Sequence, residues 1–457
     1  MAKPTTSALG TQPIGPLLIK QAVPASIGIL VMSLNVLIDS IFVGNWIGAL
    51  GIAAINVVLP VSFFIAALGM AIGIGGSSIL SRALGAGQEE KALHTFGNQI
   101  AMTLLVTVSM ISLGLYFVDA IVPAFGGQGA IAPLAKTYYT IVLYGVPFFG
   151  LCMMGNTVIR AEGKPKFAMV AMIIPSVANL FMDYIFIYVL DWGMAGAAWA
   201  TTGGNLLCFA YVLYFFRSRH TSLKPKLKHF IFSGPIVKEM GALGFVTLAR
   251  QAATSVTYLI MNTLLFSLGG EALVAVYAIV GRMLMFALFP VFGVTQGFLP
   301  IAGYNYGAQQ WQRVRESINT AILYASVLAT VVFAGLMIFP ETLTSLFLSS
   351  KNLSPEGAAL NAYVLEHTPA AMRWVFAATP IIALQLIGAA YFQAAGKAIP
   401  ALLLTLSRQA LLFIPLVYIL PYFLGTLGVW LAFPVSDLLA TLITGYFLRR
   451  EMKRFFS

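Results

Sequence analysis

Hydrophobic residues occur along this chain in runs of about twenty, and short polar segments separate the runs. A helix of about 20 apolar residues is long enough to cross the roughly 30 Å hydrocarbon core of a bilayer. The pattern therefore predicts an all-α polytopic membrane protein. We expect twelve transmembrane helices, near residues 17–43, 53–80, 96–118, 138–159, 167–190, 194–216, 243–266, 273–300, 317–340, 371–394, 399–421 and 426–448.

The composition supports a membrane protein and excludes several other classes. Of the 457 residues, 59% are hydrophobic and only 9% are charged, whereas soluble domains carry about 25% charged residues. Soluble, disordered, collagen-like and nucleic-acid-binding proteins are excluded on this ground. The two cysteines, Cys152 and Cys208, lie inside apolar runs, so we expect buried hydrophobic side chains rather than a disulfide or a metal site.

Basic residues are distributed unevenly between the predicted loops. The chain has 26 Lys and Arg against 15 Asp and Glu, a net charge of +11. One set of alternate loops holds 20 of the basic residues, the other holds only Lys136 and Lys351, and four more lie in or beside spans. Because Lys and Arg are retained on the cytoplasmic side of a membrane, both termini are predicted to be cytoplasmic, in a multi-pass protein of the cell inner membrane.

The longest polar loop divides the chain into two sets of six spans. It is strongly basic, from Arg217 to Lys238, which is typical of a cytoplasmic loop close to a lipid surface. We therefore predict a flexible cytoplasmic N-terminus, an N-lobe, a cytoplasmic linker, a C-lobe and a cytoplasmic tail, at residues 1–16, 17–216, 217–242, 243–448 and 449–457.

Three short motifs occur in equivalent loops of both halves. Six spans return the chain to its starting side, so the halves have the same orientation. We expect two six-helix repeats around a central cavity, with the transport pathway between them. The paired motifs are Gly85-Ala86-Gly87-Gln88 with Gly307-Ala308-Gln309-Gln310, Arg160-Ala161-Glu162-Gly163-Lys164 with Gln393-Ala394-Ala395-Gly396-Lys397, and Gly193 and Gly196 with Gly425 and Gly428.

Three acidic residues, Asp39, Asp183 and Asp437, fall well inside predicted spans. A charged side chain at that depth costs several kcal/mol, so each is a candidate for function. Asn35 precedes Asp39 by four residues, and Asn179 precedes Asp183 by four residues. Each amide therefore lies on the same helix face as its acid.

The surroundings of the first two acids favour an ion or proton site over a purely structural hydrogen bond to a neighbouring helix. Pro24 and Pro175 lie in the same spans and can kink them beside a cavity, and Thr201 near the start of the sixth span offers a hydroxyl. Carboxylate, amide and hydroxyl oxygens suit Na⁺, and paired buried carboxyl groups equally suit a proton. The choice between H⁺ and Na⁺ stays open.

Asp437 has no such neighbours, so the sequence supports a structural role and a functional role for it equally. Arg250 and Arg282 are candidates either to pair with Asp437 or to line the C-terminal half of a cavity. Arg408 lies near enough to the cytoplasmic edge for its side chain to extend to the membrane surface.

Enzymatic functions and ATP-driven transport lack their sequence motifs. The spans contain neither HExxH nor metal-binding cysteine pairs, and the glycine-rich Gly73-Ile74-Gly75-Gly76 lies inside a span without a P-loop lysine. No nucleotide-binding domain is recognisable, so coupling to an ion gradient remains. We expect no cofactor.

Several segments resemble the multidrug and toxic compound extrusion (MATE) transporters, and in particular MepA-like members of their prokaryotic DinF branch. The segments are Asn35-Val-Leu-Ile-Asp39-Ser-Ile-Phe-Val-Gly44, Asn179-Leu-Phe-Met-Asp183-Tyr-Ile-Phe-Ile, Gly196-Ala-Ala-Trp-Ala-Thr201 and Pro300-Ile-Ala-Gly303-Tyr-Asn305-Tyr-Gly307-Ala308.

The resemblance implies export of amphipathic or cationic organic compounds by H⁺ or Na⁺ antiport through alternating access. It places ion coupling, or Na⁺ binding, at Asp39, Asp183, Asn179 and Thr201, and a hinge at Pro24. Asn35 is a further ion-coupling candidate because of its spacing to Asp39. Some other MATE branches carry an acid in the seventh or tenth span, and this chain has none in either. Its seventh span carries Arg250 instead, which is an unusual cation for that helix. This departure puts a C-lobe cation site in doubt.

Aromatic, methionine and arginine side chains near the pathway are candidates for the substrate surface. We expect a monomer with small-molecule drugs and the lipid bilayer as its partners, and no nucleic acid. A lipid-linked oligosaccharide or lipid flippase of the same superfamily is the alternative function. The candidate substrate residues are Met32, Tyr138, Tyr139, Phe148, Met182, Arg250 and Arg282.

Overall fold

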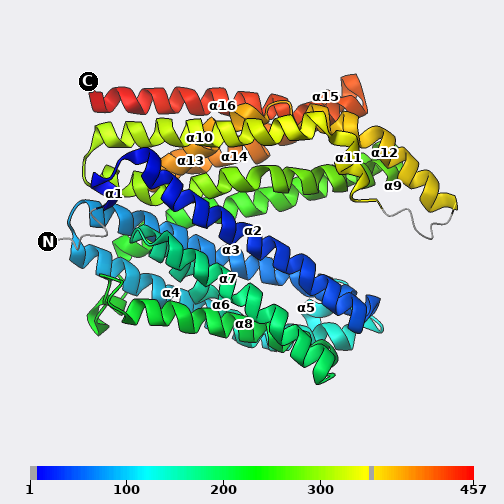
Figure 1. The fold of residues 1–457 in the computed structure, drawn as a ribbon, viewed down its shortest axis with the longest axis horizontal. Helices are drawn as coiled ribbons and strands as arrows, with labels where there is room; N and C mark the ends of the chain where they lie inside the picture. The colour runs from blue at the N-terminus through cyan, green and yellow to red at the C-terminus, as the bar shows by residue number, and fades with distance from the viewer. Residues whose placement is uncertain (1–7, 349–354, 457) are drawn as a thin grey trace. The chain divides into compact units, whose positions relative to one another are not determined.

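The computed structural model describes residues 8–348 and 355–456, and every regular element in that part of the chain is helical (Figure 1). Two π-helical segments, Tyr184–Val189 and Ser407–Leu411, and two 3-10 segments, Leu227–Phe230 and Thr379–Ile381, interrupt the α-helices. The α-helices are α1 (Ala8–Thr11), α2 (Ile14–Trp46), α3 (Ala49–Gly85), α4 (Glu89–Tyr116), α5 (Val118–Ala124), α6 (Ile131–Ala161), α7 (Pro165–Asp183), α8 (Gly193–Arg217), α9 (Gly234–Gly307), α10 (Trp311–Ile338), α11 (Pro340–Ser345), α12 (Pro355–Val375), α13 (Ile382–Ala394), α14 (Ala398–Leu406), α15 (Phe413–Leu424) and α16 (Thr426–Phe456).

The twelve predicted spans correspond to these helices. Ten helical stretches of the described residues are long and apolar enough to cross a membrane. One of them, the 74-residue α9, has non-helical backbone at Gly269 and Gly270 and so supplies two spans. The 25-residue α8 adds the twelfth.

Helices continue past three of the predicted domain boundaries, beyond their apolar parts. Helix α9 begins at Gly234, inside the predicted linker, and α16 continues to Phe456 through the predicted tail. Residues 8–16 were expected to be flexible, but α1 and the start of α2 lie there, and Leu9 and Ile14 are each only 1% exposed. Residues 1–7 lie outside the described part of the chain. Apolar length marks the hydrocarbon core alone, whereas backbone hydrogen bonding extends a helix into polar sequence.

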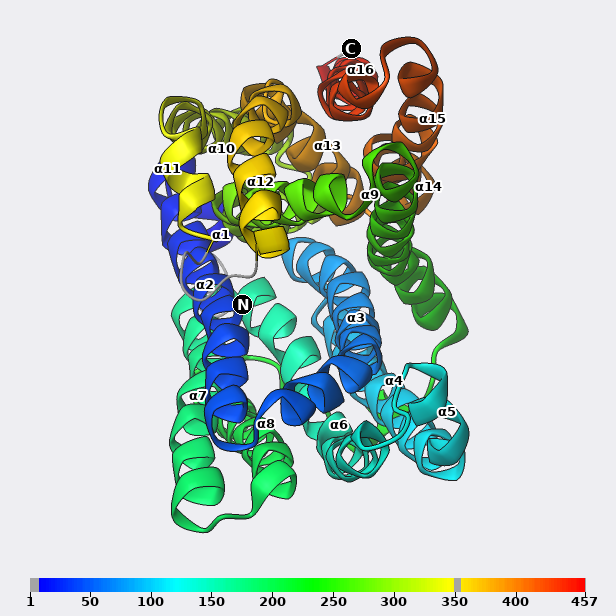
Figure 2. The ribbon, with the colours of Figure 1, turned by 90° about the vertical axis from the view of Figure 1, so that its right-hand side faces the viewer.

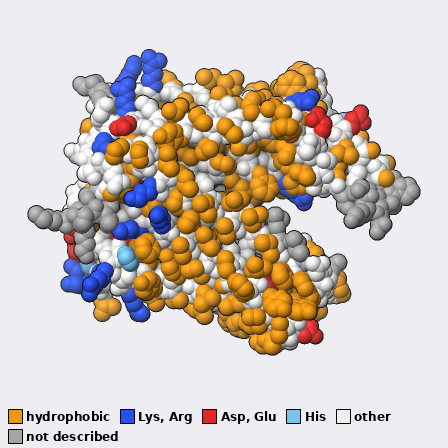
Figure 3. All heavy atoms as spheres, viewed as in Figure 1, with side chains coloured by type: hydrophobic (Ala, Val, Ile, Leu, Met, Phe, Trp, Pro, Cys, Tyr) orange, Lys and Arg blue, Asp and Glu red, His pale blue; other side chains and the backbone are white. Residues whose placement is uncertain are grey.

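Helix α4 is apolar outside and polar inside. Leu105, Val108 and Leu113 are 58%, 53% and 58% exposed, whereas Asn98 and Gln99 are fully buried. This inversion fits a helix whose outer face contacts lipid. Around α4 and its neighbouring helices, apolar side chains cover the middle of the visible face and Lys and Arg gather at one end, which we call the basic end (Figure 3).

The helices form two compact units. Unit 1 contains Met1–Leu248, Leu299–Gln310 and Ala394–Gly396, and unit 2 contains Ala249–Phe298, Trp311–Gln393 and Lys397–Ser457. In unit 1, α6 packs against α3 and α8, and α7 packs against α2 and α8; in unit 2, α16 packs against α12 and α15. The units follow the two predicted lobes, except that three short segments of the predicted C-lobe, at residues 243–248, 299–310 and 394–396, belong to unit 1.

The backbone confirms the predicted repeat. Gly87 and Gln309 end α3 and α9 with φ of +69° and +57°, and the next amide bonds back to the helix in both cases. Gly163 and Gly396 have φ of +73° and +80°, and Gly193 and Gly425 have φ of +55° and +56°. Each pair of sequence motifs therefore builds the same helix terminus twice, usually a glycine position because φ is positive.

The ends of α3 and α9 approach each other too closely for side chains. A methyl group on Gly85 would lie 1.9 Å from the Tyr304 carbonyl oxygen, and one on Gly307 would lie 2.0 Å from the Arg82 carbonyl oxygen. Asn305 adds a hydrogen bond of 3.0 Å from its Nδ2 to the Leu9 carbonyl oxygen. The 300–308 motif thus fastens the end of α9 to α1 and α3 within unit 1.

The basic linker is also fastened to unit 1. Glu162, 2% exposed, accepts hydrogen bonds from Thr221 Oγ1 at 2.7 Å, Ser222 N at 2.9 Å and Ser222 Oγ at 3.0 Å. Burial raises the pKa of Glu162, and these hydrogen bonds oppose the rise. Asn98 binds the linker further on, through the carbonyl oxygens of His229 and Ile231.

Candidate functional site

The two acids that the sequence places on separate spans meet in unit 1. Helix α2 carries Asp39, and Asp183 is the last residue of α7; the two helices lie side by side (Figure 2). The carboxyl groups of Asp39 and Asp183 are in direct contact. Asp183 is fully buried, while Asp39 is partly buried. The structure therefore assembles one acid pair from two helices.

This acid pair lacks protein donors. Both carboxylate oxygens of Asp183 and Oδ1 of Asp39 are buried without a hydrogen-bond partner among the described residues, and so is Nδ2 of Asn179. A carboxyl–carboxyl hydrogen bond can form only if one of the two groups carries a proton. Ionised carboxylates in such a site carry a large desolvation cost. The pair therefore requires a proton or a cation to be neutral.

A tyrosine completes the surroundings of the acid pair. The hydroxyl of Tyr138, on α6, hydrogen-bonds Thr201 on α8 and lies close to both acids. Thr201 Oγ1 also donates to the Ala197 carbonyl oxygen at 3.1 Å. Tyr138 was predicted as a substrate contact, and nothing in its sequence neighbourhood indicated this position beside the acids.

Local packing determines where Asp183 lies. A methyl group on Gly204 would lie 2.8 Å from the Pro175 carbonyl oxygen, so this glycine lets α8 approach α7. The π-helix Tyr184–Val189 begins directly after Asp183, and such segments are frequent at functional sites. Helix α2 runs unbroken through the buried Pro24. Asn35 lies partly buried one turn before Asp39 on α2.

The third intramembrane acid, Asp437, forms an ion pair within the protein. Its Oδ1 accepts a charged hydrogen bond of 2.6 Å from Arg408 Nε, and the two side chains are 9% and 10% exposed. Two expectations are therefore wrong: Arg408 does not extend to the membrane edge, and Asp437 pairs with neither Arg250 nor Arg282. Arg408 lies in the π-helix Ser407–Leu411, where the wider turn changes the direction of side chains, and no sequence pattern indicated this pair.

Comparisons with known proteins agree with this architecture. The MatE family model matches residues 24–185 and 247–419. The chain belongs to the MatE family. As a MATE protein it is a multi-pass membrane transporter of the multidrug efflux family and not an enzyme, which confirms the resemblance found in the sequence.

Individual relatives have several different functions. The multidrug export protein MepA of Staphylococcus haemolyticus is 24% identical over 408 residues, covering 89% of this MATE chain and 87% of the relative. The FAD transporter of Shewanella oneidensis is 24% identical over 455 residues, covering 96% and 95%. A MOP-superfamily transporter from Pyrococcus furiosus, whose binding pocket of reverse polarity is said to suggest a different function, is 25% identical, with full coverage of both chains and a TM-score of 0.90.

Several candidate substrate residues of this MATE protein contact neighbouring helices. The Met182 sulfur packs over Gly203 of α8, and the Phe148 ring lies 5.4 Å from the ring of Phe209. Tyr139 is 3% exposed. Their role in substrate binding stays a prediction. So does that of the partly buried Met32 and Arg250 and the exposed Arg282.

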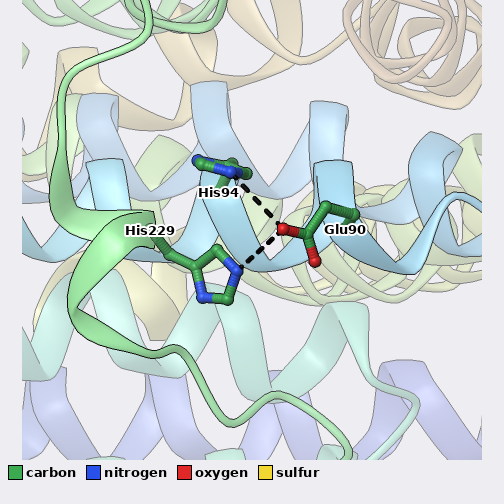
Figure 4. Close-up of side chains that lie close together, drawn as sticks. All are labelled: Glu90, His94 and His229. Atoms are coloured by element: carbon green, nitrogen blue, oxygen red, sulfur yellow. Dashed lines mark hydrogen bonds and ion pairs between the residues drawn. The ribbon is translucent and has the colours of Figure 1, made fainter.

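A histidine cluster at the basic end was missed in the sequence. Glu90 Oε1 lies 3.7 Å from His94 Nε2 and 3.2 Å from His229 Nε2 (Figure 4). The four-residue spacing of Glu90 and His94 was a usable signal, whereas His229 comes from the distant linker. These three side chains have the ligand types of a metal site.

The hydrogen bonds of the cluster oppose metal binding. His229 Nδ1 accepts the Lys226 N–H at 2.8 Å, so Nε2 carries the hydrogen and faces Glu90. A ligating nitrogen must be free of hydrogen, and its ring normally donates through the other nitrogen. Lys228 Nζ also lies 2.5 Å from Glu90 Oε1. The cluster fits a clamp between α4 and the linker better than a metal centre.

Proposed function

We propose that this chain exports amphipathic, cationic organic compounds in exchange for H⁺ or Na⁺, by alternating access of its two repeats. The observation that carries the proposal is the buried acid pair Asp39 and Asp183, in which three of the four carboxylate oxygens are buried without a hydrogen-bond partner among the described residues. One elementary charge moving through 100 mV gains about 2.3 kcal/mol, which supports roughly a fiftyfold gradient of an uncharged compound at 1.4 kcal/mol per tenfold. Exchange of one monovalent cation for one H⁺ or Na⁺ moves no net charge, so the concentration gradient of the ion drives it. The ion is transported and is not a cofactor.

In the proposed cycle, an ion from outside neutralises the acid pair and favours one conformation. Substrate binds in the other conformation, after the ion has left, and is released outward. Because Pro24 cannot donate a helix hydrogen bond, α2 can bend there when the charge on Asp39 changes. The chain acts as a monomer in the inner membrane, with its basic end and both termini in the cytoplasm.

The donor set supports a proton more directly than Na⁺. Na⁺ binding would use Asp39, Asp183, Asn179 and Thr201. Among the described residues, the buried unpartnered oxygens at this site all belong to the two carboxyl groups, and none belongs to Asn179 or Thr201. A proton needs only one carboxylate oxygen.

Purified protein in liposomes tests the proposal, with H⁺ and Na⁺ gradients imposed separately and without ATP. Ethidium and FAD serve as alternative substrates, since relatives include a multidrug exporter and an FAD transporter. We expect the H⁺ gradient to drive ethidium. Movement of ethidium only with ATP would refute ion coupling, and movement of FAD alone would refute the substrate class.

Cysteine labelling tests the orientation. Leu227 in the linker is 89% exposed, and Gln128 is exposed in the loop before α6. The native cysteines Cys152 and Cys208 are 2% and 1% exposed, so their background reaction is small. We expect Leu227→Cys to react only with reagents that enter the cytoplasm and Gln128→Cys to react from outside; the reverse would invert the proposed direction of export.

A further inference from the structure

A small cavity of unit 1 is rich in positive charge. Its volume is about 250 Å³, and it lies where the start of α2 meets the start of α7. Lys20, Lys164 and Lys166 line it, and none of the described residues in its lining is acidic. The volume is below the roughly 300–1,000 Å³ of pockets for drug-sized ligands. The cavity therefore suits a small anionic group.

The three lysines lack an ion-pair partner in the described part of the chain. None of the ion pairs among the described residues includes them. Glu162 is close to Lys164 in sequence, but it accepts hydrogen bonds from Thr221 and Ser222. Burial lowers the pKa of Lys164, and the nearby Lys20 ammonium lowers it further, although Glu162 opposes both effects. An anion in the cavity would relieve this repulsion.

A buried glutamine provides independent evidence for a polar ligand. Gln21 lines the same cavity and is 2% exposed, and its Oε1 is buried without a hydrogen-bond partner. Such an atom costs about 1–3 kcal/mol unless something donates to it. A phosphate that retains a hydroxyl, or the hydroxyl of a lipid headgroup, can supply that donor.

The start of α7 and the apolar wall narrow the ligand class. The 19-residue α7 begins at Pro165 in the cavity lining, and the start of a helix attracts anions. Leu17 and Phe167 give the cavity an apolar side. Positive charge, a hydrogen-bond acceptor and an apolar wall together match a phosphate group attached to a lipid.

We propose that this cavity binds a phosphate group, supplied by the headgroup of an anionic phospholipid. Lys20 lies on α2, and Lys164 and Lys166 lie at α7. A bound phosphate therefore joins the two helices that carry Asp39 and Asp183, at a point four residues before Pro24. The inference concerns binding and does not depend on the proposed transport cycle.

Lipid binding to the purified full-length chain in neutral detergent tests the site, with phosphatidylglycerol, phosphatidylcholine and inorganic phosphate as probes. We expect phosphatidylglycerol to bind at least about tenfold more tightly than phosphatidylcholine. The combined Lys20→Gln, Lys164→Gln and Lys166→Gln variant should lose that preference, and Lys20→Gln alone should lose part of it. The matched control removes three exposed charges from the linker, with Arg219→Gln, Lys224→Gln and Lys226→Gln, and should keep the preference.

Two results would overturn the proposal. One is an unchanged lipid preference in both Lys20 variants, and the other is an equal loss in the linker control, which would indicate general surface charge. If inorganic phosphate displaces the lipid and stabilises the wild type but not the triple variant, the phosphate site stands and its ligand is a soluble phosphate. If the triple variant does not fold, the single variant Lys20→Gln still tests the site, because the exposed Lys20 can be changed without disturbing the core.

Discussion

The two units each bury an acid in the membrane-spanning region, and they neutralise it in different ways. In unit 2, Asp437 is held by Arg408 at 2.6 Å. In unit 1, Asp39 and Asp183 contact each other and their buried oxygens have no donor in the described part of the chain. A fixed cation neutralises Asp437 permanently, whereas the acid pair can be neutralised only by something that comes and goes. Burial of an acid does not by itself indicate ion coupling. What matters is whether the protein supplies a cation or a hydrogen-bond donor that neutralises or satisfies the acid.

A third site, with a fourth buried acid, extends the comparison. Glu162 in unit 1 is satisfied by hydrogen bonds from Thr221 and Ser222 instead of by an ion. By the same reasoning it is structural. The comparison therefore predicts that substitutions in the acid pair abolish transport, whereas substitutions of Asp437 or Glu162 lower stability.

The largest effect is expected at the acid pair. Asp39→Asn and Asp183→Asn each keep the shape of the side chain but remove its charge and its titration, so gradient-driven export should fall to the level of empty vesicles. Folding should be retained because no protein cation loses its partner. Ethidium efflux in liposomes measures this, with the exposed Asp119→Asn as the matched control. Export at the wild-type rate by both variants would remove the basis of the comparison.

Asp437→Asn should act on stability. It leaves the Arg408 guanidinium buried without its counter-charge, and breaking a buried pair costs about 3–5 kcal/mol. The double variant Arg408→Leu/Asp437→Leu removes both charges and should recover most of that loss. Thermal unfolding monitored by tryptophan fluorescence compares the variants.

The export rate per folded molecule sharpens this second prediction. The double variant should export at close to the wild-type rate, since a permanently neutral pair exchanges no ion. A stable double variant that does not export would place a coupling role in unit 2.

Glu162→Ala should lower the free energy of unfolding by less than Asp437→Asn does. It leaves three donors of the linker without an acceptor, and lost hydrogen bonds of this kind cost about 1–3 kcal/mol in total stability. Hydrogen exchange around residues 221–223 should speed up while export per folded molecule stays unchanged. Unchanged exchange there would mean that Glu162 does not anchor the linker.

The smallest effect is expected at Pro24. Pro24→Ala restores a helix hydrogen bond in α2, which stiffens the proposed hinge, so turnover should slow while ion binding is retained. Pro147→Ala in α6 is a matched control, since that helix carries no acid of the pair. Comparing export rates with ion-dependent tryptophan quenching separates slower movement from lost binding.

Features that depend on local sequence were predictable. The spans followed from apolar length, and the repeat followed from glycines that the backbone uses at equivalent helix ends, such as Gly163 and Gly396. The acid pair was anticipated from Asp39, Asp183 and their neighbouring amides.

Contacts between helices were not predictable, because they depend on how each helix is rotated about its axis. The wider turn at Ser407–Leu411 directs Arg408 to Asp437, and periodicity of 3.6 residues gives no sign of it. Tyr138 reaches Thr201 from another helix. His229 joins Glu90 from the linker, 139 residues away.

Ion release on substrate binding tests the central claim most directly. Ethidium is added to purified protein in weakly buffered detergent, and protons released are counted with a pH dye, with ²²Na⁺ release measured in parallel. We predict that the wild type and Arg408→Leu/Asp437→Leu release an ion, and that Asp39→Asn and Asp183→Asn release none. Release by both unit 1 variants, together with none by the unit 2 double variant, would contradict the account.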